Sequence, residues 1–222
     1  MSGLASDNSS TTVSSLLEHG DFGVGTFKDM DGEMIMLNSV AYQMKADGST
    51  PKVEPDTKVP FAMVTRFQAE KTETLRLESK AKLQDHMERL LPTAKNAFVL
   101  MRAKGAFKRM KIRAIHAQDY KNQKLSELTE HQMVKEFEDV KGTIIGLESP
   151  AWSSGVSVVG LHAHFIDDGH SFGGHILELE SDGDVEVELA TSSNFNLQLP
   201  TSDEFGAREL ETDEEGIKKA EG

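Results

Sequence analysis

The stretch GLHAHFIDDGHSFGGH, residues 160–175, decides both the fold class and the candidate site. Two apolar runs flank the turn signal Asp168-Gly169, so the stretch predicts a β-hairpin. Side chains two residues apart on a strand share a face, which places His162 and His164 on the same side. The sequence therefore predicts two imidazoles side by side on the first strand of a hairpin.

The register of this hairpin brings a third histidine to the pair. If Gly169 and His170 form a two-residue loop, His164 lies directly opposite His175. Opposed Cβ atoms in a sheet are roughly 4.5–5.5 Å apart. Three converging imidazoles fit a divalent metal ion, most simply Zn²⁺ with an open coordination position. In this interpretation Gly173 and Gly174 leave space beside the metal, and His170 points to solvent from the turn.

The rest of the chain predicts many short strands and one clear helix over residues 79–91. A shorter helix is expected over residues 12–19, with Gly20 as its stop. Strands are expected in six regions, and loops over residues 45–60 and 117–128. Because strands and helices do not alternate regularly, the expected fold class is α+β. The expected strand regions are 33–42 (strand, turn, strand), 61–67, 97–102, 106–115 on the far side of Gly105, 143–147 and 155–161.

Composition excludes several classes of function. The chain has 24 Lys+Arg and 37 Asp+Glu, a formal charge of −13, which argues against binding nucleic acid or an anionic membrane surface. It has no Cys, which excludes disulfides and thiol catalysis. No apolar run of membrane-spanning length and no signal peptide is present, so we expect a cytoplasmic protein. Residues 201–222 form an acidic tail that by composition is disordered.

The histidine hairpin resembles the metal hairpin of the acetolactate decarboxylase family. Further motifs of that family follow in collinear order, so that the resemblance covers residues 12–222. These motifs are Gly20-Asp21-x-Gly23-x-Gly25-Thr26 with Asp31-Gly32-Glu33-Met34, Pro60-Phe61-Ala62, Gly105-x-Phe107-Lys108-x-x-Lys111-x-Arg113, Val140-Lys141-Gly142-Thr143-x-Ile145-Gly146, and Gln198-Leu199-Pro200.

The resemblance implies a fold and an assembly. It implies an N-terminal mixed-sheet domain with one main helix, residues 12–140, and a smaller β-rich metal-binding domain, residues 141–222. The active site would lie in the cleft between them, with the C-terminal tail returning to it. The family also implies a homodimer.

The resemblance further implies an activity, the zinc-dependent conversion of 2-acetolactate to acetoin and carbon dioxide. The implied zinc ligands are His162, His164 and His175, and the implied catalytic residues are Glu33, Arg113 and Glu221. Zinc would act as a Lewis acid on the substrate oxygens. Arg113 would offer a planar donor fork, with Lys111 and Arg109 as alternatives on the same strand face. A glutamate would protonate the reacting carbon.

The residues alone leave other interpretations open. A cupin-like oxygenase with three histidines and iron is one, in which Asp167 or Asp168 would supply the carboxylate ligand. A metal-binding module without catalytic activity is another. Without the resemblance, Glu33 is an exposed residue after a turn, Arg113 a surface residue on a strand, and Glu221 part of the disordered tail.

Overall fold

The computed structural model describes residues 11–121, 123 and 125–207, and the chain divides into two compact units. Unit 1 comprises residues 1–66, 114–133 and 196–222, and unit 2 comprises residues 67–113 and 134–195. Each unit is assembled from separate segments of the chain. The boundary between residues 133 and 134 lies at the start of a continuous strand, β7 (Met133–Ser149).

Unit 1 contains a four-stranded antiparallel sheet in the order β3-β2-β1-β4. The tight β2–β3 turn is made by Asn38 and Ser39, both with positive φ, as the strand-turn-strand pattern predicted. The connection between β1 and β2 is longer than a tight turn and contains a 3-10 helix, η1 (Lys28–Met30). The strands are β1 (Phe22–Thr26), β2 (Glu33–Leu37), β3 (Val40–Met44) and β4 (Phe61–Thr65).

Short helices complete unit 1. The helix α2 (Val13–His19) begins at Thr12, whose side chain accepts a hydrogen bond from the Ser15 amide, and ends at Gly20, which confirms the prediction. The expected loop 117–128 contains α4 (Leu125–Leu128), followed by η2 (Thr129–His131). Apolar residues from α4 pack with Met30 and Ile115. The last described helix is α5 (Asp203–Ala207).

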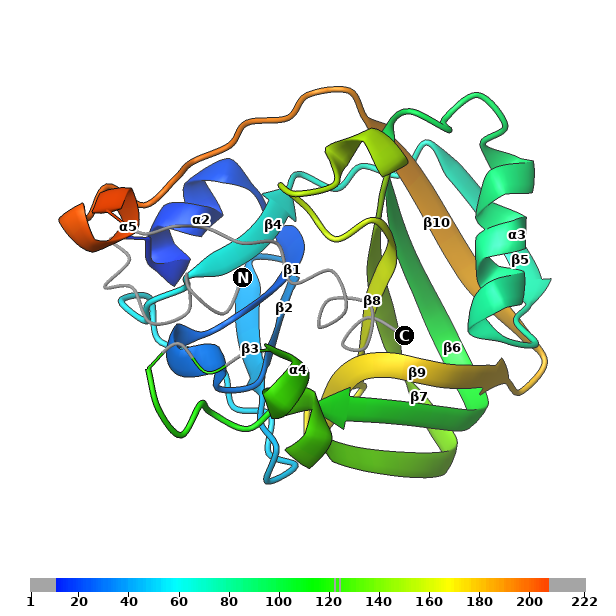
Figure 1. Cartoon of the computed structure of the whole chain (residues 1–222). Coiled ribbons are helices and arrows are strands. Elements are labelled where there is room, and N and C mark those ends of the chain that lie inside the picture. The colour runs from blue at the N-terminus through cyan, green and yellow to red at the C-terminus, as the bar shows by residue number, and fades with distance from the viewer. Residues whose placement is uncertain (1–10, 122, 124, 208–222) are drawn as a thin grey trace. The chain divides into compact units, whose positions relative to one another are not determined.

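Unit 2 contains a six-stranded sheet in the order β5-β10-β6-β7-β8-β9, with an additional β6–β9 pairing. The long strand β6 pairs with β10 through residues 98–104 and with β9 through residues 107–113. Strands β6, β7, β8 and β9 thus form a closed ring, because β6 pairs with β9 as well as with β7 (Figure 1). The strands are β5 (Lys71–Arg76), β6 (Phe98–Ala114), β7, β8 (Gly160–Asp167), β9 (Gly173–Ser181) and β10 (Asp184–Ser192).

The predicted break at Gly105 is wrong, because β6 runs through this residue without interruption. A Cβ at position 105 would lie 2.5 Å from the Val185 side chain on β10. Glycine at this position therefore permits close packing against Val185 and does not end the strand.

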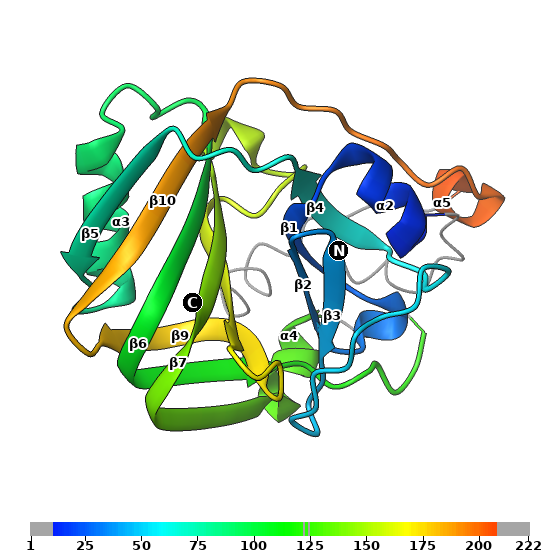
Figure 2. The same cartoon turned by 180° about the vertical axis from the view of Figure 1, so that it is seen from behind.

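The helix α3 (Lys80–Leu90) covers one face of the unit 2 sheet (Figure 2). It begins at Ser79, whose side chain accepts from the Lys82 amide, and it buries Leu83 and Met87 as its periodicity predicted. Ala163 and Phe165 of β8 belong to the same apolar cluster. Since neighbouring residues on a strand point to opposite faces, the even-numbered residues of β8 face away from α3.

The fold is mostly β, with two antiparallel sheets and few helices. The family resemblance implied a mixed sheet, and this expectation is wrong, because the strands of both sheets pair antiparallel. Within the described part of the chain, no helix has both the length and the apolar character needed to cross a bilayer.

Candidate metal centre

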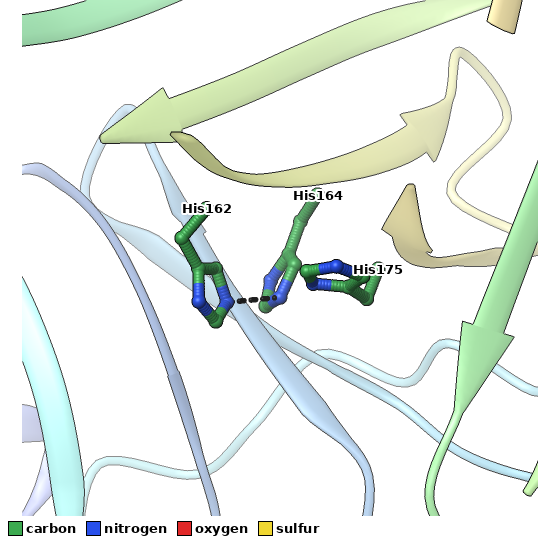
Figure 3. A group of neighbouring side chains, drawn as sticks. All are labelled: His162, His164 and His175. Atoms are coloured by element: carbon green, nitrogen blue, oxygen red, sulfur yellow. Dashed lines mark hydrogen bonds between the residues drawn. The ribbon is translucent and has the colours of Figure 1, made fainter. Parts of the chain in front are cut away.

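Three buried histidines converge on the face of β8 and β9 that lies opposite α3. His164 is the cross-strand partner of His175, which confirms the predicted register. The potential ligand atoms of His162, His164 and His175 lie within 4.8 Å of one another. The two Nε2 atoms of His162 and His164 are 2.9 Å apart, and the His175 ring lies next to them (Figure 3). Among the described residues, this is the one group of three or more His, Cys, Asp or Glu side chains placed to hold a metal ion.

The turn of the hairpin is wider than predicted, although the register is the same. The Asp167 amide donates to the Phe172 carbonyl, and the His170 amide donates to the Asp167 carbonyl. The loop thus has four residues where two were expected. The predicted two-residue loop and the observed four-residue loop both leave His164 opposite His175. The observed loop is longer by one residue on each strand, Asp168 and Ser171, so the register of the remaining pairs is unchanged. His170 is exposed in the turn with a positive φ, as the sequence predicted.

The Asp167 carboxylate stabilises this turn. It accepts hydrogen bonds from the Gly169, Ser171 and Phe172 amides and from the Ser171 hydroxyl. Asp167 also points to the opposite face of β8 from the histidines, and Asp168 is exposed in the loop. Neither aspartate supplies the carboxylate ligand that the cupin-like interpretation requires.

The surroundings keep His175 in the form that binds metal. Burial lowers the pKa of His175 well below its usual value, and the nearby positive charge of Arg113 lowers it further. A neutral imidazole has a free ring-nitrogen lone pair for coordination at neutral pH. On β7, Leu147 lies opposite His162 and Ile145 opposite His164, and both side chains are buried. The site is therefore apolar on this side.

Sequence reasoning did not single out these two apolar neighbours. The β-rich run 143–147 located their strand, but its register with β8 depends on a pairing that the local pattern does not specify.

Arg113 is the buried cation beside the triad. It is 1% exposed and is the direct partner of His175 across the β6–β9 ladder. Lys111 and Arg109, the alternatives on the same strand, instead form partly exposed ion pairs with Glu178. Of these three cationic residues, Arg113 is thus the one that is buried beside the histidines.

The role predicted for Gly174 is corrected. It pairs with Phe165 and lies next to His175, so its position points to the face opposite the histidines. A Cβ at Gly174 would lie 2.5 Å from the Arg113 carbonyl oxygen on β6. Gly174 therefore allows the close approach of β6 and β9 and does not provide space for the metal.

Of the two predicted catalytic glutamates, the structure describes Glu33 and not Glu221. Glu33 is the first residue of β2 in unit 1, where it pairs with Thr26 and is 6% exposed. It is thus a buried carboxyl group and not an exposed residue after a turn. Glu221 lies outside the described residues. Within unit 2, the structure brings together Arg113 and the three histidines.

The fold and site together define a mostly β protein with a buried three-histidine group suited to a metal ion. The model of the family Alpha-acetolactate decarboxylase matches residues 1–212. The chain belongs to the alpha-acetolactate decarboxylase family.

Individual relatives agree with this membership. The chain is 41% identical over 180 residues to the alpha-acetolactate decarboxylase of Methanosarcina mazei, an alignment that covers 79% of this chain and 62% of the relative. It is 42% identical over 183 residues to that of Streptococcus thermophilus, covering 79% and 75%. The crystal structure of the Bacillus subtilis strain 168 enzyme superimposes with a TM-score of 0.92 at 29% identity, covering 100% of this chain and 96% of that one.

Proposed function

We propose that this chain is a metal-dependent carboxy-lyase that converts 2-acetolactate to acetoin and carbon dioxide. The observation that carries the proposal is the buried triad with Arg113 beside it, in a chain of the alpha-acetolactate decarboxylase family. We further propose that the protein works as a homodimer in the cytoplasm, in acetoin biosynthesis.

The proposed metal is zinc, held by His162, His164 and His175. Three nitrogen donors within 4.8 Å of one another fit a small divalent ion that retains an open position for substrate. A bound Zn²⁺ supplies Lewis-acid polarisation of the substrate oxygens. The chain contributes three imidazoles and no thiolate or carboxylate from the described residues, so the loaded site has a net positive charge that favours an anionic substrate.

Arg113 is proposed to hold the substrate anion. Its guanidinium is buried, so solvent screens its charge weakly and its interaction with a carboxylate is strong. The planar fork also orients the substrate carboxylate through two parallel hydrogen bonds. As the carbon–carbon bond breaks and carbon dioxide leaves, the electron pair remains on the substrate, and a fixed positive charge stabilises it.

Glu33 and Glu221 are proposed to handle the proton. The carbon that loses carbon dioxide must gain one proton to give acetoin, and a glutamic acid on one side of it makes that step stereospecific. Burial of Glu33 is compatible with this role, because a buried carboxyl group is shielded from bulk water. The role requires the Glu33 carboxyl group to reach the bound substrate. The role of Glu221 requires the C-terminal tail to return to the metal centre.

One assay tests the proposal. Purified protein is incubated with racemic 2-acetolactate, and acetoin is measured with and without a metal chelator, followed by zinc restoration. Acetoin that disappears with the chelator and returns with zinc supports the proposal. A protein that binds zinc and yet forms no acetoin is the non-catalytic metal-binding module. Turnover that depends on dioxygen supports the oxygenase interpretation.

A further inference from the structure

The hydroxyl of Ser149 is a buried polar group that makes no hydrogen bond within the described part of the chain. Ser149 is the last residue of β7 and is 2% exposed. Most buried side-chain hydroxyls have a protein partner in place of water. Ser153 is an example in the same unit, since its hydroxyl donates to the Pro150 carbonyl. An unpaired buried hydroxyl costs free energy, which a ligand that bonds to it recovers.

Ser149 lies on the same face of the unit 2 sheet as the three histidines. Its neighbour Glu148 accepts a hydrogen bond from Gln84 of α3, so Glu148 faces α3 and Ser149 faces away from it. Leu147, the next residue of β7 on the Ser149 face, lies opposite His162. Ser149 is therefore a diagonal neighbour of His162, and residues in such positions are roughly 7–8 Å apart. This separation is close to the length of a small organic acid.

The cross-strand partner of Ser149 leaves space beside the hydroxyl. That partner is Gly160, which has a φ of +87°. A Cβ built at Gly160 would meet no atom of a non-adjacent residue within 4 Å. The neighbouring pair on the same face is filled instead, by Leu147 and His162. Next to the triad, the sheet thus has one cross-strand pair with a polar group and no opposing side chain.

We propose that Ser149 is a further substrate-binding residue, whose hydroxyl donates a hydrogen bond to the ketone or hydroxyl oxygen of 2-acetolactate. The substrate carboxylate is assigned to Arg113, because a charged donor binds an anion more strongly than a neutral one does. Arg113 is paired with His175 on β9, whereas Ser149 lies on β7 beyond His162. A substrate held by both residues is fixed in orientation as well as in position. The inference rests on the proposed decarboxylase activity and extends its substrate contacts to β7.

Binding of acetoin to the zinc-loaded protein tests this assignment by calorimetry. Acetoin keeps the ketone and hydroxyl oxygens of the substrate but has no carboxylate, so its binding does not require an anion-holding group. Ser149→Ala raises the dissociation constant of acetoin about 5- to 10-fold, the effect of losing one hydrogen bond between neutral groups. Ser149→Thr retains the hydroxyl, and the space beside Gly160 accommodates its methyl group. It binds acetoin more tightly than Ser149→Ala does.

Ser153→Ala is the matched control, because both serines are buried but only the Ser153 hydroxyl is hydrogen-bonded within the protein. Ser153→Ala lowers the melting temperature and leaves acetoin binding and kcat/KM for 2-acetolactate unchanged. Ser149→Ala lowers kcat/KM about 5- to 10-fold at an unchanged or higher melting temperature, because the free protein loses no hydrogen bond. Zinc content is the same in both variants and in the parent.

The outcomes separate this assignment from the proposed reaction. A parent that forms no acetoin from 2-acetolactate overturns both. If the parent is active and Ser149→Ala binds acetoin and turns over substrate like the parent, the reaction stands and Ser149 does not contact the substrate. The assignment is also wrong if Ser149→Ala loses acetoin affinity together with zinc or with thermal stability, since the hydroxyl then supports the metal centre or the fold.

Discussion

Arg113 lies directly across the β6–β9 ladder from His175, and both side chains are buried. The guanidinium charge helps to keep His175 neutral, because it lowers the pKa of the imidazole. The residue proposed to hold the substrate anion and a proposed metal ligand are thus paired across two neighbouring strands, so the backbone of the sheet fixes the distance between them.

Arg113→Lys tests the anion-holding role. Lysine keeps the charge but not the planar fork, and losing one charge-stabilising donor in a catalytic site typically costs about 10²–10³ in rate. We expect a loss of acetoin formation on this scale with zinc content unchanged. Arg109→Lys is the control, because Arg109 is in a partly exposed ion pair with Glu178. Equal activity of the two variants would reject the assignment of Arg113.

His164→Ala tests the metal centre. His164 is fully buried beside His162 and His175, so its loss removes one of the three proposed ligands. Elemental analysis is expected to show zinc well below one per chain, and acetoin formation is lost. His170→Ala, in the exposed turn of the same hairpin, retains full zinc content. A His164→Ala protein with one zinc per chain would show that the ligand set is wrong.

Glu33→Gln tests the proposed proton donor. The substitution preserves size but removes the acid, so we expect turnover to fall by about 10²-fold or more with metal content unchanged. Glu54→Gln, at an exposed position of the same unit, is the control and retains parental activity. If Glu33→Gln forms acetoin at the parental rate, Glu33 is a buried structural residue only.

The lowered pKa of His175 predicts a pH dependence for the metal-free protein. Below about pH 6.5 an unfolded histidine takes up a proton that the folded protein excludes, so stability falls as the pH decreases through this range. The maximal slope for one group is about 1.4 kcal/mol per pH unit. Melting temperatures of chelator-treated protein between pH 8 and 5.5 measure it. His175→Gln is expected to flatten this dependence, and an unchanged slope would assign the effect to other groups.

Removing only Glu221 and Gly222 tests the tail. We expect this deletion and Glu221→Gln to lose acetoin formation, because both remove the carboxylate proposed to act on the substrate. Glu214→Gln, a change of equal charge in the same tail, retains activity. If all three proteins decarboxylate 2-acetolactate like the parent, the tail has no catalytic role.

The three-histidine group could be predicted from the sequence because all three residues belong to one hairpin. A turn signal and a period of two fix the register of one hairpin, which places His164 opposite His175 whether the loop has two residues or four. The choice of Arg113 over Arg109 is different. Alternation places both on one strand face, and only the pairing of β6 with β9 shows which of them is buried.

The parts of the fold that were missed depend on distant pairing. β5 is mostly polar and exposed, and its strand conformation is stabilised by β10, which lies more than 100 residues further along the chain. The two discontinuous units follow from the same cause. A local pattern carries no information on which distant segments of the chain meet, so it does not show that each unit is assembled from separate segments.

The short separation of the three ligands has a consequence for folding. The ligands lie within residues 162–175, and closing a loop of this size costs little entropy. Arg113 reaches them only when a segment some sixty residues earlier in the chain has docked, a slower and more costly event. We therefore expect the three proposed metal ligands to come together early in folding, and Arg113, the residue proposed to hold the substrate anion, to join them later.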